Sequence, residues 1–151
     1  MIKQQQRGNI RQPLSRLLGW TRREVRVWPL AVGLAVVLFP FDWLADVWPL
    51  FRQAFDVVFV TARDHAIGHT TMFFLLGLLV LLSLPLLSLR PRWYVGGIVL
   101  VAFCQEALQD LSRQRPPNIW EGRDMLFDLA GALLAFGVIW LWRVVSQRYF
   151  S

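Results

Sequence analysis

Residues 66–89 read AIGHTTMFFLLGLLVLLSLPLLSL, and His69 is the one ionisable side chain in this stretch. A helix of roughly 20 apolar residues spans the hydrocarbon core of a bilayer, which is about 30 Å thick. The stretch holds no Asp, Glu, Lys or Arg, and Arg90 follows it directly. It therefore predicts a membrane-spanning helix.

Three further segments, at 27–45, 94–111 and 125–142, have the length and apolar character of a span. The whole chain of 151 residues is 56% hydrophobic, which is too apolar for one soluble core of ordinary composition. The sequence thus predicts an all-α membrane protein, a bundle of four transmembrane helices in one domain at 27–151. The single Cys104 lies in an apolar run and indicates no disulfide.

The positive charges predict the orientation of the spans. Eleven Lys and Arg residues flank the predicted spans on one side and five on the other, so both termini are expected in the cytoplasm. Residues 1–26 form a basic tail, in which 13–26 is either an amphipathic helix at the lipid interface or a basic flank that sets topology. The net charge of +6 sits in the gaps between apolar runs, which argues against binding to nucleic acid.

Ionisable and amide side chains gather at the predicted outer ends of three spans. An ionised side chain at mid-bilayer costs about 2.5–3.5 kcal/mol, so such residues call for a reason. Glu106 and Gln109 are three residues apart, and Asp124 and Asp128 are four apart, so each pair shares a helix face. We therefore predict a buried cluster at the outer leaflet that contains the following residues: His69, Glu106, Gln109, Asp124, Asp128 and, from the connecting loop, Arg113, Arg115 and Arg123.

The residues of this cluster have functional and structural interpretations. As functional groups, Glu106, Asp124, Asp128 and His69 are candidate catalytic residues or ligands of a cationic group. Gln109 and the three Arg residues are candidate ligand-binding residues. As structural groups, Asp124 is an acceptable N-cap of the fourth span, and Glu106 pairs with Arg115.

Three residues of the spans are expected to serve helix packing. For His69 we favour a hydrogen bond between helices over a metal site, and we predict neither a metal nor a cofactor. Gly131 and Ala135, four residues apart, predict close helix packing.

Three motifs within residues 64–140 resemble the VanZ-like family of small bacterial membrane proteins. They are HTTMFFLLG at 69–77, EALQ at 106–109 and DMLFDLAG at 124–131. Asp128 stands where the family usually has Asn, and Arg113 and Arg115 compete for the position of the family's Arg. The resemblance implies a multi-pass protein of the bacterial cytoplasmic (inner) membrane. It also implies a place in the cell envelope, with a link to glycopeptide antibiotic resistance.

Three classes of function follow from the sequence. We favour an envelope protein that binds a lipid-linked or amphiphilic ligand at the outer polar cluster. The alternatives are an enzyme that acts on a lipid-linked envelope precursor by acid-base chemistry, and a non-catalytic helical subunit of a membrane complex. The expected partners are membrane lipids, a lipid-linked envelope ligand and, in the last case, another membrane protein.

Overall fold

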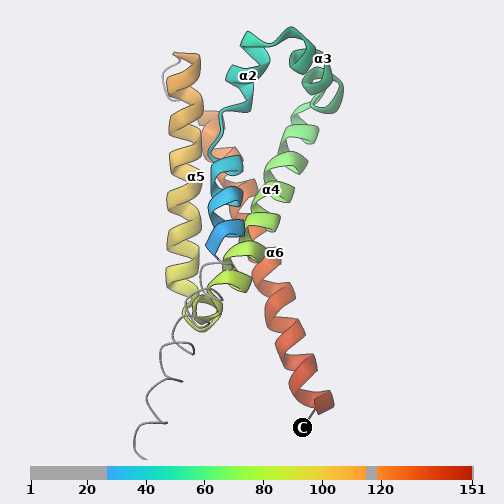
Figure 1. Cartoon of the computed structure of the whole chain (residues 1–151), viewed down its shortest axis with the longest axis vertical. Helices are drawn as coiled ribbons and strands as arrows, with labels where there is room; N and C mark the ends of the chain where they lie inside the picture. The colour runs from blue at the N-terminus through green and yellow to red at the C-terminus, as the bar shows by residue number, and fades with distance from the viewer. Residues whose placement is uncertain (1–26, 115–118, 151) are drawn as a thin grey trace, which may run out of the picture.

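A computed structural model of the chain describes residues 27–114 and 119–150 (Figure 1). The predicted amphipathic helix at 13–26 and the candidate Arg115 lie outside these residues. The described part is all-helical and contains no strand. Its elements in chain order are a helix at Val27–Val37, α2 (Phe41–Val47), α3 (Pro49–Val58), α4 (Ala62–Ser83), the 3-10 helix η1 (Pro85–Leu89), α5 (Pro91–Arg113) and α6 (Ile119–Phe150).

Helices α4 and α5, and the part of α6 at Gly122–Arg148, are long and apolar enough to cross a membrane. This confirms the prediction of an all-helical chain with several segments that could span a membrane. The expected spans at 94–111 and 125–142 lie inside the longer α5 and α6. Three of the four predicted spans therefore correspond to single long helices. The first predicted span, at 27–45, differs and is described next.

The predicted span at 27–45 is not one straight helix. The helix Val27–Val37 and α2 meet at a bend of 57°, and Pro40 stands directly before α2. Proline supplies no backbone N–H and disfavours helical backbone at the residue before it, so the helix breaks here. The two pieces qualify together as one broken span by length and composition.

Local sequence determines where α4 begins and where it ends. At its start, Thr61 and Asp64 form a capping box, in which Thr61 N–H donates to Asp64 Oδ2 at 2.8 Å. At its end, the predicted boundary of the span at residue 89 is wrong, because α4 ends at Ser83 and Pro85 opens η1. The apolar run thus continues past the helix as a tight 3-10 turn.

A short helical corner closes one end of the bundle. In Figure 1, α2 and α3 lie at the opposite end from η1 and the C-terminal end of α6. Helix α3 has ten residues and no buried side chain, and it is too short to span a bilayer. In Figure 1, α3 lies above the start of α4, whereas α2 lies at the level of the end of α5, and the two short helices bound the site described below.

The core is built on the crossing of α4 and α6. An added Cβ at Gly131 would lie 2.1 Å from the Thr70 backbone oxygen, so the two backbones are in direct contact. A Cβ at Gly77 would likewise lie 2.9 Å from the Cβ of the fully buried Ala135. Close packing at Gly131 and Ala135 is therefore confirmed, as expected of small residues between membrane helices.

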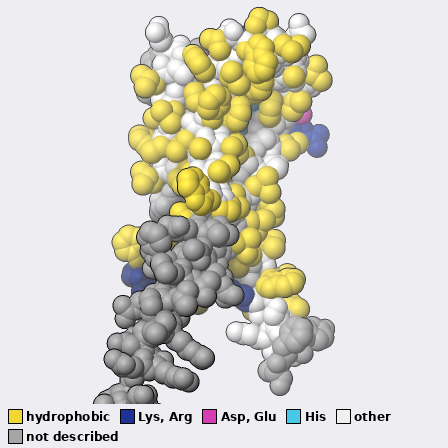
Figure 2. Space-filling model, viewed as in Figure 1, with side chains coloured by type: hydrophobic (Ala, Val, Ile, Leu, Met, Phe, Trp, Pro, Cys, Tyr) yellow, Lys and Arg dark blue, Asp and Glu magenta, His cyan; other side chains and the backbone are white. Residues whose placement is uncertain are grey.

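Large apolar side chains cover much of the outside of the bundle. Figure 2 shows many hydrophobic side chains and few charged ones on the described part of the visible face. The exposed residues include Leu86, Leu100, Phe103 and Trp142. Apolar patches of this extent are rare on soluble monomers, and they match a surface that lipid covers.

Candidate functional site

His69 and Asp128 form a hydrogen bond between α4 and α6. His69 Nδ1 donates to Asp128 Oδ1 at 2.8 Å, and the Asp128 side chain is fully buried, with 0% of its surface exposed. The expected hydrogen bond of His69 to another helix is confirmed. A buried carboxylate with a charge-assisted bond of this kind fixes the orientation of the imidazole ring.

The contact at Gly131 brings α4 and α6 close enough for this bond to form. Thr70 follows His69 in the chain, and its carbonyl lies against Gly131, three residues after Asp128. Because a residue with a Cβ cannot stand at Gly131 without moving Thr70, the glycine sets the separation of α4 and α6 at this level. The absence of a side chain at Gly131 therefore permits the close approach of α4 and α6 at the site.

Glu106 of α5 completes what we call the polar cluster: His69, Glu106 and Asp128. Glu106 is 7% exposed, and one ligand-type atom from each of the three residues lies within 4.8 Å of the others. His69 is seven residues from the start of α4 and Glu106 seven from the end of α5. At 1.5 Å per residue both are about 10 Å inside the bundle, at the end that holds α2 and α3. The expected shared depth is therefore present.

Asp124 lies at the edge of the polar cluster. It is half-buried, one turn before Asp128, and it interacts electrostatically with both His69 and Asp128. Its proposed role as an N-cap is wrong, because α6 begins at Ile119 and Asp124 lies inside the helix. The Asp124 carboxylate therefore adds negative charge beside the polar cluster.

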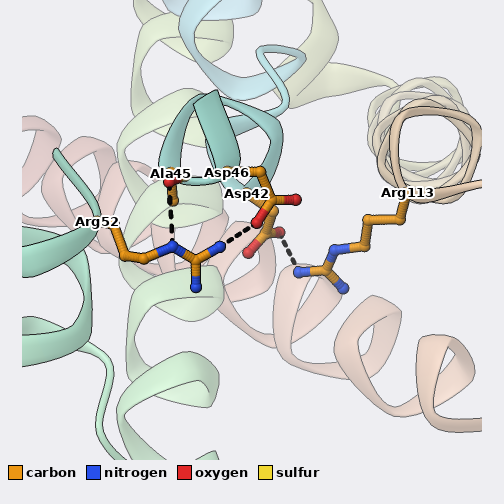
Figure 3. Close-up of polar contacts among 5 residues, drawn as sticks. All are labelled: Asp42, Ala45, Asp46, Arg52 and Arg113. Atoms are coloured by element: carbon orange, nitrogen blue, oxygen red, sulfur yellow. Dashed lines mark hydrogen bonds and ion pairs between the residues drawn. The ribbon is translucent and has the colours of Figure 1, made fainter. Parts of the chain in front are cut away.

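The described Arg residues do not join the polar cluster. Arg113 instead binds Asp42 of α2, with Nη2 and Oδ2 2.5 Å apart (Figure 3). Arg123 is exposed, and its guanidinium lies 5.6 Å from the centre of the Phe127 ring. Arg113 therefore ties α2 to the end of α5, which the sequence did not predict.

A second ion pair stabilises the corner itself. Arg52 of α3 binds the Asp46 carboxylate and donates through Nε to the Ala45 carbonyl oxygen at 3.2 Å (Figure 3). Figure 3 shows Arg52 and Arg113 approaching α2 from two different elements. These contacts join α3 to α2 and α2 to the end of α5.

The corner, α4 and α5 line an open cavity of about 630 Å³. Its walls are mainly apolar, and the aromatic rings of Phe51, Phe55 and Phe59 follow one another at centroid distances of 6.0 and 4.7 Å. Its polar lining includes His65, His69, Gln105, Gln109 and the carboxylates of Asp42 and Asp64. His69 therefore belongs to both the cavity wall and the polar cluster, whereas Gln109 lines the cavity and its predicted role in ligand binding stays a prediction.

Sequence reasoning missed two of these residues. Gln105 is 2% exposed, and its Oε1 has no hydrogen-bond partner among residues 27–114 and 119–150. His65 lines the same cavity and packs against Phe59, with ring centroids 5.2 Å apart. His65 lies one helical turn before His69, and that spacing was the available signal. Nothing in the polar run at residues 105–110 singled out Gln105.

The arrangement supports two kinds of chemistry. An imidazole held by a buried carboxylate, with a second carboxylate close by, can accept and deliver protons. The same three side chains also offer one nitrogen and carboxylate oxygens at separations from which a metal ion can be bound.

Comparison of the chain with protein families, with curated proteins and with solved structures finds no match.

Proposed function

We propose that this protein binds an amphiphilic, lipid-linked ligand in the cavity between the α2–α3 corner, α4 and α5. The observation that carries the proposal is the lining of the 630 Å³ space, which is aromatic and aliphatic with a few polar side chains. Binding sites for small amphiphiles commonly have about this volume, roughly 300–1,000 Å³, and this mixture of walls. The apolar part of the ligand contacts the rings of α3, and its head group contacts α4 and α5.

The amide groups of the polar lining can bind an anionic head group. Gln105 and Gln109 carry amide N–H donors to a phosphate or carboxylate, whereas the Nδ1 of His69 is already bonded to Asp128. The lining also contains two carboxylates that already have partners, Asp42 and Asp64. In this proposal the amides replace the Arg contacts that we first expected.

The proposal includes the membrane topology. We propose four crossings, with the broken segment Val27–Val47 as the first and both termini in the bacterial cytoplasm. The Lys and Arg distribution supports this orientation. It places the cavity in the outer leaflet, where a VanZ-like envelope protein would meet lipid-linked precursors.

Cysteine labelling tests this topology. On a Cys104→Ser background, Gln53→Cys in α3 and Arg90→Cys after η1 are treated with a membrane-impermeant maleimide in intact bacterial cells. We expect rapid labelling at position 53, and labelling at position 90 only after the membrane is permeabilised. The opposite pattern, or equal labelling of both, contradicts the orientation.

Ligand binding is tested with a polyisoprenyl phosphate as the probe. Purified full-length protein in lipid nanodiscs is titrated, and occupancy is followed by tryptophan fluorescence and native mass spectrometry. Gln109→Leu should weaken binding about tenfold, which corresponds to about 1.4 kcal/mol for one hydrogen bond to a charged group. Gln53→Leu, the same change on exposed α3, should leave affinity unchanged. Equal affinities for both variants would contradict a role of the cavity.

A second candidate function is acid-base catalysis on such a ligand, which the His69–Asp128 bond beside Glu106 favours. Turnover of a labelled lipid-linked precursor by purified protein tests it. Glu106→Gln should then abolish turnover but retain binding of the precursor. If Glu106→Gln instead fails to yield folded protein, Glu106 is a structural residue and the catalytic proposal loses its support.

A further inference from the structure

We infer that His69, Glu106 and Asp128 bind a divalent transition-metal ion, with Zn²⁺ as the best match. The inference concerns the polar cluster alone and holds whether or not an amphiphile binds in the cavity. It reverses our expectation from the sequence that the protein holds no metal. Two observations support it: the separation of the ligand atoms and a buried carboxylate oxygen.

The separations are close to those of a metal site. Bonds of about 2.0–2.2 Å to Zn²⁺ place neighbouring ligand atoms of a tetrahedral site about 3.4 Å apart. In the polar cluster all three ligand atoms lie within 4.8 Å of one another, and His69 Nδ1 and Asp128 Oδ1 are 2.8 Å apart. Small side-chain rotations therefore suffice, with the metal ion replacing the proton that His69 and Asp128 share.

A buried oxygen of the cluster also calls for a ligand. Asp128 Oδ2 has no hydrogen-bond partner in the described part of the chain, although the side chain is fully buried and its other oxygen binds His69. Leaving a carboxylate oxygen buried without a partner is costly. The imidazole ligand favours zinc-like ions over Mg²⁺ and Ca²⁺, which prefer sets of oxygen ligands.

Metal binding is tested on the purified full-length protein in detergent, with an affinity tag that lacks histidine. After chelator treatment the protein is titrated with Zn²⁺ and, separately, with Co²⁺, whose visible absorption reports its coordination. We expect one ion per chain and competition of the two ions for one site. Elemental analysis of the protein after removal of free metal measures the stoichiometry.

Variants assign the site. Asp128→Asn, Glu106→Gln and His69→Gln each remove one ligand and should weaken Zn²⁺ binding by more than about 100-fold, beyond the effect of losing a residue that only orients a ligand. Asp110→Asn on α5 and Asp56→Asn on α3 are matched changes outside the polar cluster, and they should bind as the wild type does. Circular dichroism and gel filtration identify variants that do not fold, and any one folded ligand variant decides the outcome.

Cys104 provides a control for binding elsewhere. It is a free, half-buried thiol on α5, and Cys104→Ser should leave Co²⁺ binding and its spectrum unchanged. Thiolate ligation, seen as an intense near-ultraviolet charge-transfer band that this variant removes, would overturn the inference. Failure of the wild type to retain an ion at micromolar Zn²⁺, or ligand variants that bind as tightly as the controls, would also overturn it. None of these results depends on binding of the polyisoprenyl phosphate.

Discussion

Replacing Gly131 by Ala should separate α4 from α6 and break the hydrogen bond between His69 and Asp128. The new Cβ would lie 2.1 Å from the Thr70 oxygen and 3.0 Å from the Phe74 nitrogen, and both are backbone atoms that cannot rotate away. Ordinary contact begins near 3.4 Å, so the helices must move apart by about 1.3 Å at this level. The His69–Asp128 distance of 2.8 Å would then approach 4 Å, beyond hydrogen-bond range.

The expected loss of stability combines two costs and one gain. Overpacking of a well-packed contact costs about 1–3 kcal/mol. Loss of a hydrogen bond between membrane helices costs about 0.6–1.7 kcal/mol. Alanine in place of glycine inside a helix stabilises the folded protein by about 0.5–1 kcal/mol. The free energy of unfolding should therefore fall by about 1–4 kcal/mol.

Reversible unfolding in mixed micelles, with increasing fractions of a denaturing detergent, measures this change. Gly137→Ala is the matched control, because the same substitution in α6 meets no atom within 4 Å. It should be neutral or stabilise the protein by up to about 1 kcal/mol through helix propensity. The two alanine variants are thus expected to change stability in opposite directions.

A double-mutant cycle with Asp128→Asn then tests the link to the site. If Gly131→Ala already breaks the bond to His69, Asp128→Asn should cost less in the Gly131→Ala background than in the wild type. Equal stabilities of the two alanine variants, or fully additive effects with Asp128→Asn, would refute the reasoning. Either result would mean that the glycine contact does not set the distance between His69 and Asp128.

Three further substitutions have defined outcomes in the same unfolding measurement. Tyr94→Phe removes a buried 2.8 Å hydrogen bond from the phenol to a backbone carbonyl of α6 and should cost about 1 kcal/mol. Phe73→Ala empties a fully buried site and should cost about 3–5 kcal/mol, whereas Phe103→Ala, at a side chain that is 61% exposed, should cost less than about 1 kcal/mol. Asp42→Asn breaks the partly exposed pair with Arg113 and should cost less than about 1 kcal/mol, with an effect that shrinks at high salt; a cost above 2 kcal/mol would contradict this assignment.

Much of the fold could be predicted from the sequence because lipid imposes a length and a composition on each span. Helices α4, α5 and α6 correspond to the three clearest apolar runs. The same length rule placed His69, Glu106 and Asp128 at one depth, because 1.5 Å per residue fixes the position of a side chain along its helix. The small residues Gly131 and Ala135 also indicated a close crossing, which the structure contains.

Other features depend on how the helices are rotated and joined, which apolar length does not specify. The bend before α2 directs α2 and α3 across the end of the bundle, and this corner creates the cavity. Arg113 has Asp42 within reach only because α2 returns to the end of α5. Its partner therefore could not be predicted from spacing within the chain.

The sequence alone determined that this chain is helical, with several segments long and apolar enough to cross a membrane, and which of its ionisable side chains lie at the same depth along the helices. The tertiary structure alone decided that His69, Glu106 and Asp128 meet while Arg113 and Arg123 do not. The physical reason is that depth follows from the rise of each helix, whereas contact follows from the crossing of α4 and α6 at Gly131 and from the corner above them.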